Sequence, residues 1–232
     1  MIRGRTFLAW AVIEAGLCFQ GCGNRLPPPG GPVDEIPPRI ISLRPDSNAV
    51  GVDVRVAIRI TFDEEIQVAM GREGIAMNPF DPDLRVEYGY KTIEVRREGG
   101  LNPGCTHCLQ LLPEIKDLRG NPLAGSWKFC FSTGDSLTRG NIRGVIEGPE
   151  ERVGDLIFQA VHLPDSLVYR ARVGSDGAFT LTHLPRGSYR LLAFIDSRRD
   201  SRYDPVEEPG EEIGAELGGE PIEVRFDLKS PD

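Results

Sequence analysis

Residues 54–62 read Val-Arg-Val-Ala-Ile-Arg-Ile-Thr-Phe, and apolar side chains occupy alternate positions along the segment. Because successive side chains of a β-strand point to opposite faces, this alternation predicts a strand with one face in a core. Similar short segments recur between turn signals such as Gly99-Gly100 and Gly120-Asn121-Pro122. This spacing is typical of an immunoglobulin-like (Ig-like) β-sandwich. The predicted strands of this first set are residues 40–42, 54–62, 84–90, 92–96, 106–112 and 127–133.

A second set of alternating segments follows Gly140. The Asp176-Gly177 pair between two of these segments is a strong hairpin signal. We therefore predict an all-β fold with two β-sandwich domains in tandem, residues 39–134 and 141–232, joined by a hinge at 135–140. The predicted strands of the second set are residues 142–146, 155–163, 167–173, 179–181, 189–194 and 222–228.

The composition limits the range of partners. The 232 residues include 27 Lys and Arg against 35 Asp and Glu, so the formal net charge is −8. A chain of this charge lacks the basic surface that attracts nucleic acid or anionic lipid, and we expect no nucleic-acid partner. The 27 glycines and 19 prolines agree with many turns between short strands.

The N-terminal residues have the pattern of an export signal. Arg3 and Arg5 precede an apolar run over residues 6–19, which is too short to cross a hydrocarbon layer of about 30 Å as a helix. The run ends at Gly21-Cys22, and residues 22–38 form a Pro/Gly-rich segment that predicts an extended tether. We predict a signal peptide at residues 1–21. The alternatives are a secreted chain cut nearby and an uncleaved or misassigned start.

The residues before Cys22 resemble the lipobox of bacterial lipoproteins. The resemblance implies cleavage before Cys22 and acylation of that residue, which would make the membrane a partner through its acyl chains. Phe19 and Glu14 depart from the family pattern, which prefers Leu and an uncharged core at these places. Gly23 rather than Asp follows the cysteine, which implies the outer membrane of the cell envelope as the location.

Both predicted domains also resemble known families. The segments 60–64 and 116–123 look like those of the bacterial Ig-like domain of the SbsA type. Asp176-Gly177-Ala178-Phe179 and residues 184–189 resemble the carboxypeptidase regulatory-like, transthyretin-like β-sandwich. With the lipobox and tether, the chain is similar to a family of envelope lipoproteins. That resemblance implies architecture and location, because a shared sandwich fold does not fix function.

The sequence favours a non-catalytic function. The three histidines, His107, His162 and His183, lie outside any Gly-x-Ser-x-Gly, His-Glu-x-x-His or phosphate-binding glycine pattern. We predict a structural or interaction module of the cell envelope that binds glycan or protein, and not an enzyme. The alternative is a secreted enzyme, or an enzyme-accessory domain, that acts on envelope polymers.

The cysteines suggest one disulfide. Cys105 and Cys108 have the spacing of half a zinc site, but on a strand they point to opposite faces, and His107 lies on an otherwise apolar face that favours the core. Cys130 shares its face with Cys108 when the two strands pair antiparallel, as the last strands of an Ig-like sandwich do. We predict a Cys108–Cys130 disulfide; the alternative is free thiols.

The last acidic span, residues 196–223, holds ten acidic residues against three arginines. It predicts a solvated loop and a charged edge strand that protects the sandwich from edge pairing. Counted from Asp196, four carboxylates also match the spacing of a calcium loop: Asp196, Asp200, Asp204 and Glu207. Arg198 and Ser201 break that pattern, so the loop predicts a weak calcium site. Without calcium, the arginines would pair with these carboxylates.

Overall fold

The structure is a computed structural model, and it describes residues 33–67 and 74–228. The predicted signal peptide, Cys22 and the tether as far as Pro32 lie outside the described residues. The chain is all-β, as predicted, with a 3-10 helix η1 at Glu150–Asp155 as its helical element in the described part. The described helices include none that is long and apolar enough to cross a membrane.

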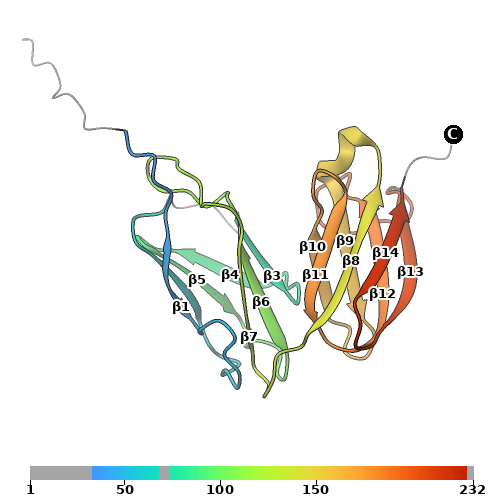
Figure 1. The fold of residues 1–232 in the computed structure, drawn as a ribbon, viewed down its shortest axis with the longest axis horizontal. Coiled ribbons are helices and arrows are strands. Elements are labelled where there is room, and N and C mark those ends of the chain that lie inside the picture. Colours follow the sequence, from blue (N-terminus) through green and yellow to red (C-terminus); the bar gives the residue numbers. More distant parts are fainter. Residues whose placement is uncertain (1–32, 68–73, 229–232) are drawn as a thin grey trace, which may run out of the picture. The chain divides into compact units, whose positions relative to one another are not determined.

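The first seven strands form the first sandwich (Figure 1). One sheet has the order β1-β2-β5-β4 and the other has the order β3-β6-β7, and all pairs are antiparallel. Alternate side chains of both sheets meet in one core, and Ile60, Leu109 and Phe131 have no exposed surface. The strands are β1 (Ile40–Arg44), β2 (Ile58–Phe62), β3 (Ile75–Asn78), β4 (Leu84–Tyr88), β5 (Thr92–Arg97), β6 (Thr106–Leu111) and β7 (Trp127–Ser132).

Two details of the first sandwich differ from the sequence-based prediction. Strand β2 begins at Ile58 rather than at residue 54, because the Asp53 carboxylate and carbonyl oxygens accept the Arg55 and Val56 N–H groups in a turn. Strand β3 was not predicted. Its four residues are too few to show a clear alternation, although Ile75 and Met77 are buried.

The remaining strands form the second sandwich, with sheet orders β10-β9-β12-β13 and β11-β8-β14. Strand β14 runs parallel to β8, and the other pairs are antiparallel. The Phe158 and Phe179 rings stack in the core with centroids 3.8 Å apart, beside Phe226. The strands are β8 (Gly140–Glu147), β9 (Leu156–His162), β10 (Val168–Arg172), β11 (Ala178–Leu184), β12 (Gly187–Ile195), β13 (Gly210–Leu217) and β14 (Ile222–Asp227).

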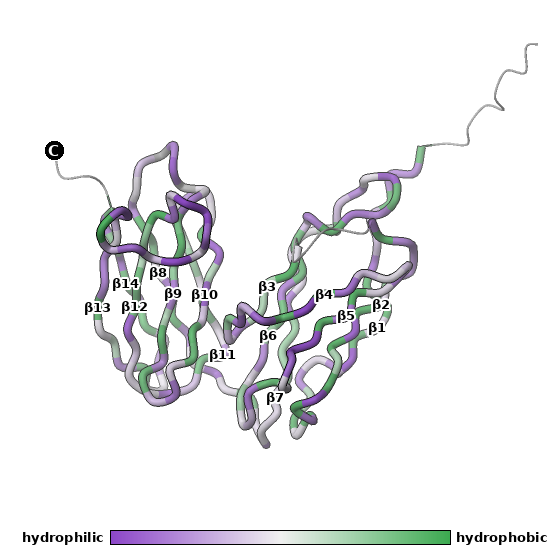
Figure 2. The backbone as a smooth tube through the Cα atoms, turned by 180° about the vertical axis from the view of Figure 1, so that it is seen from behind, coloured by the Kyte–Doolittle hydropathy of each residue, from purple (hydrophilic) through white to green (hydrophobic). Residues whose placement is uncertain are grey.

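Strand β13 is one of the two edge strands of its sheet and carries three of the ten acidic residues of the acidic span. It pairs with β12, with Ile213 opposite Leu191. Glu212 and Glu216 are exposed along it. Figure 2 shows this strand as more hydrophilic than the neighbouring β12. The arrangement agrees with the prediction of a charged edge, since charges along an open edge oppose pairing with another chain.

Thr138, in the predicted hinge, forms hydrogen bonds with both sandwiches. Its N–H donates to the Thr106 hydroxyl at 2.9 Å, and its own hydroxyl donates to the His183 carbonyl. Strand β8 already begins at Gly140, inside the predicted hinge. Residues 35–232 accordingly form one compact unit that contains both sandwiches.

Candidate functional site

Cys108 and Cys130 lie directly opposite each other on β6 and β7 and are joined in a disulfide. Their Cα atoms are 4.1 Å apart. Both residues are buried, with 5% and 4% of their surface exposed. The structure therefore brings together the two cysteines that strand alternation placed on one face.

Cys105 and His107, which are close to Cys108 in the sequence, are both buried. The Cys105 thiol is free and buried, and burial raises its pKa to about 11. The His107 ring stacks on Phe131, and its Nε2 lies 3.1 Å from the Asn102 carbonyl oxygen. Burial lowers the pKa of His107, so the ring is held neutral in the core. This agrees with the prediction of a core histidine and not with a zinc half-site.

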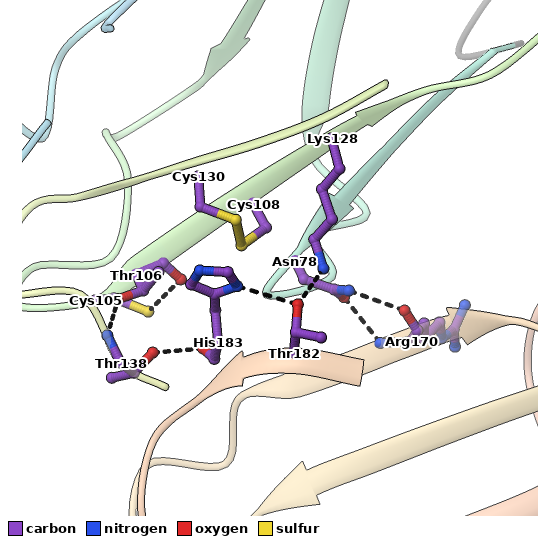
Figure 3. The surroundings of a disulfide bond; sticks show 10 residues. All are labelled: Asn78, Cys105, Thr106, Cys108, Lys128, Cys130, Thr138, Arg170, Thr182 and His183. Carbon is purple, nitrogen blue, oxygen red and sulfur yellow. Dashed lines mark hydrogen bonds between the residues drawn. A yellow bond between two sulfur atoms is a disulfide. The ribbon is translucent and has the colours of Figure 1, made fainter. Parts of the chain in front are cut away.

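Part of the outer face of the β3-β6-β7 sheet lies against strands β10 and β11 of the second sandwich. Lys128 of β7 donates to the Thr182 hydroxyl of β11, and His183 lies beside the disulfide (Figure 3). The ligand atoms of His183, Cys108 and Cys130 all lie within 4.8 Å of one another. We call this contact the joint. It comprises Asn78, Thr106, Cys108, Lys128, Cys130, Thr138, Arg170, Thr182 and His183.

Asn78 closes the open edge of strand β10 within the joint. Its side-chain oxygen accepts the Arg170 N–H at 2.8 Å, and its side-chain nitrogen donates to the Arg170 carbonyl oxygen at 2.9 Å. The Phe80 N–H adds a bond of 2.6 Å to the Val168 carbonyl oxygen. An edge strand exposes such unpaired groups, and here the first sandwich supplies their partners. This contact could not be predicted from the sequence, because a single Asn before Pro is an ordinary turn pattern.

A β-bulge places His183. The register of β11 against β8 shifts between Thr182 and Leu184, and His183 has a φ of 63°. Left-handed φ values are uncommon for residues other than glycine, and bulges redirect side chains. Burial, with a smaller effect of the Lys128 charge, lowers the pKa of His183.

A groove of about 650 Å³ adjoins the joint. Ile75, Met77, Phe80 and Leu84 from the first sandwich and Leu156 from the second contribute apolar surface to it. The Arg170 guanidinium lies 3.8 Å over the Phe80 ring and donates to the Ser201 carbonyl oxygen. The groove thus combines apolar walls with a few charged groups, Arg170, Arg172, Asp81 and Asp200, as many ligand sites do.

The loop between β12 and β13 is organised by two buried carboxylates. Asp196 accepts the N–H groups of Asp200 and Ser201 at 3.1 and 2.8 Å. Glu208, which the sequence analysis did not single out, accepts those of Ser197 and Asp204 at 2.9 and 3.0 Å. We call residues 196–208 the acidic loop.

Arg198 occupies the centre of the acidic loop. Its guanidinium forms ion pairs with Asp200 at 3.0 Å and with Asp204 and Glu207 at 3.3 Å. Three of the four predicted calcium ligands therefore surround an arginine. Among the described residues, the closely spaced groups of potential metal ligands include none from this loop. The structure describes the arginine-paired form, and calcium binding stays a prediction.

The bacterial Ig-like domain family matches residues 34–133, which spans the first sandwich. This match and the observed sheets support an Ig-like domain over the first sandwich, and the SbsA subtype stays a prediction. The transthyretin-like relationship of the second sandwich also stays a prediction. No curated protein sequence matches the chain.

Several solved structures resemble the chain weakly. An L,D-transpeptidase from Mycobacterium smegmatis has a TM-score of 0.31 and 14% identity, and the match covers 84% of this chain and 91% of that one. The N-terminal part of the bacterial S-layer protein SbsC has a TM-score of 0.31 and 13% identity, and the match covers 70% of this chain and 41% of that one. BcpA, the major pilin subunit of Bacillus cereus, has a TM-score of 0.29 and 9% identity, and the match covers 84% of this chain and 71% of that one. Scores this low support no inference about function.

Proposed function

We propose that the chain is a lipid-anchored protein of the cell envelope that acts as a non-catalytic structural or interaction module. The joint is the observation that carries this proposal. Its hydrogen bonds tie an Ig-like domain to a second sandwich through Asn78, Lys128 and Thr138. Two sandwiches bonded in this way suit a fixed spacer or a platform for a partner better than a mobile pair.

The anchor in this proposal is Cys22. The apolar run before it and the prolines and glycines after it support acylation followed by an extended tether. The outer membrane is the proposed location, on the lipobox resemblance and on Gly23. The tether would hold the Ig-like domain away from the membrane surface.

A non-catalytic role is supported by the engagement of all three histidines. His107 is a core residue that bonds the Asn102 carbonyl oxygen. His162 lies between the Asp165 carboxylate at 2.7 Å and the Arg186 carbonyl oxygen at 3.1 Å. His183 bonds the Thr182 hydroxyl at 3.0 Å. Each ring has a structural partner. The hydroxyl bonded to the His183 ring, that of Thr182, also accepts a hydrogen bond from the Lys128 ammonium group, which supports a structural role for this pair.

Acylation is tested with labelled palmitate and membrane fractionation. Cys22→Ala should abolish both the label and membrane retention. Cys18→Ala is the matched control, because Cys18 lies inside the apolar run and should leave both unchanged. Equal palmitate incorporation by the Cys22→Ala variant and the parent would refute the anchor.

The partner class is tested by incubating the purified protein with cell-wall glycan, polysaccharide and envelope-protein fractions. Retention on one fraction supports the interaction module, and the groove beside Phe80 and Arg170 is the proposed contact surface. Phe80→Ala should then weaken retention. Turnover of an ester or peptide panel would instead support the alternative, a secreted enzyme or accessory domain.

A further inference from the structure

We propose that reduction of the Cys108–Cys130 disulfide creates a binding site for one thiophilic cation of the zinc class, with Cys108, Cys130 and His183 as its ligands. The site is distinct from the groove and from the acidic loop. It does not depend on the lipid anchor or on a non-catalytic function.

The geometry supports three ligands to one ion. The two sulfur atoms and a ring nitrogen of His183 already lie within 4.8 Å of one another. Ligand atoms around a tetrahedral zinc ion are about 3.3 to 3.8 Å apart, as bond lengths of about 2.0 to 2.3 Å require. Rotation of the two cysteine side chains on adjacent strands would open the space between the sulfur atoms.

The His183 side chain reaches the disulfide because of the local backbone of β11. The bulge in β11 and the left-handed backbone turn its side chain toward the disulfide (Figure 3). Its Nδ1 bonds the Thr182 hydroxyl at 3.0 Å, which leaves Nε2 as the ligand atom. Histidines that bind metals usually make such a second hydrogen bond through the other ring nitrogen.

The chemistry balances with a dithiol as the reductant. Exchange with a dithiol transfers two electrons and two protons, so that the S–S bond breaks and the dithiol becomes a disulfide. Binding of a divalent cation then forms two metal–sulfur bonds and one metal–nitrogen bond and releases the two thiol protons. Three protein ligands leave a fourth position for water. Two thiolates and an imidazole favour zinc over calcium or magnesium.

The test uses the full chain with Cys18, Cys22 and Cys105 replaced by serine, so that Cys108 and Cys130 are its remaining cysteines. The protein is reduced with a phosphine, freed of reductant without oxygen, and dialysed against Zn²⁺. We expect one equivalent of zinc on the reduced protein and none on the oxidised protein. Cobalt substituted for zinc should give thiolate-to-metal charge-transfer absorption.

His183→Ala should weaken zinc binding at least tenfold. Loss of a residue that only hydrogen-bonds a metal ligand typically weakens metal binding about 10- to 100-fold, and in this proposal His183 is itself a ligand. His162→Gln is the matched control, because His162 is bonded elsewhere in the second sandwich and should leave affinity unchanged. Circular dichroism follows folding throughout. The proposal is overturned if the reduced protein unfolds, if it stays folded and binds no zinc, or if His183→Ala binds zinc as the parent does.

Discussion

In the joint, the disulfide is buried and the side chains of Asn78 and Thr182 are half-buried. In the acidic loop, Arg198 and most of its carboxylate partners are exposed and pair within one segment. Arg198 has 43% of its side chain exposed, and three carboxylates pair with it. A buried polar group that loses its partner cannot recover it from water, and an exposed one can. Changes in the joint should therefore have the larger effects.

The largest expected effect comes from removing the disulfide. Cys108→Ala with Cys130→Ala should lower the free energy of unfolding by about 3 kcal/mol, because the bond closes a loop across a sequence separation of 22 residues. Urea denaturation of the parent and the double variant measures the difference. Cys105→Ser is the control for a buried free thiol. A loss below about 0.5 kcal/mol would contradict the loop-closure argument.

Asn78→Ala should lower stability by about 1 to 2 kcal/mol, since it leaves the N–H and carbonyl groups of Arg170 without their side-chain partners. Calorimetry should show the two sandwiches unfolding less cooperatively. Asn78→Asp keeps the acceptor for the Arg170 N–H and loses only the donor, so it separates the two bonds. An unchanged, single transition in Asn78→Ala would mean that this amide does not couple the sandwiches.

The contrast between the two regions also separates what sequence could predict from what it could not. Strand alternation predicted most strands, the all-β class and the facing positions of Cys108 and Cys130, because these depend on local periodicity and on one strand pair. Alternation cannot tell whether an outward face meets water or another domain. The covering of the β6–β7 face by Thr182 and His183 was therefore not predicted.

The same limit applies to single residues. Asn78 acts through contacts with a strand about 90 positions away, and Glu208 acts by accepting backbone N–H groups, so neither forms a motif. Strand β13 was not among the separate strands predicted, although Ile213, Ala215 and Leu217 alternate along it, because its glutamates were assigned to the charged span as a whole. In the acidic loop, by contrast, Arg198 was recognisable from spacing alone, since a cation at a ligand position is a local feature.

The pH dependence of stability should reveal the buried histidines. Burial lowers the pKa of His107 below its ordinary value, whereas the unfolded chain takes up a proton near pH 6.5. Below that pH the unfolded state binds more protons, so stability falls as pH decreases from 7 toward 5. His107→Phe should make this decline shallower. Some decline should persist, because the pKa of His183 is lowered in the same direction. Urea denaturation at several pH values measures it, and an equally steep decline in the variant would exclude His107 as a cause.

The smallest expected effect in the absence of metal is that of Arg198→Asn. Its ion pairs are exposed, so the melting temperature should change by no more than about 2 °C. The variant frees Asp200, Asp204 and Glu207 and supplies an amide oxygen at a ligand position of the calcium pattern. At about 5 mM calcium we therefore expect the melting temperature of the variant to rise above its value with chelator. The melting temperature of the parent should rise less, because Arg198 still competes for the carboxylates.

Arg202→Asn is the matched control for this last comparison, because it removes the same charge from the same loop at an exposed position. Its melting temperature should respond to calcium no more than that of the parent. A calcium response in the parent as large as that in Arg198→Asn would show that calcium displaces Arg198 from the site formed by Asp196, Asp200, Asp204 and Glu207. A variant that ignores calcium would show that freeing these carboxylates is not sufficient. The loop would then need the glycine that Ser201 replaces, since the calcium pattern places its sharp turn at that position.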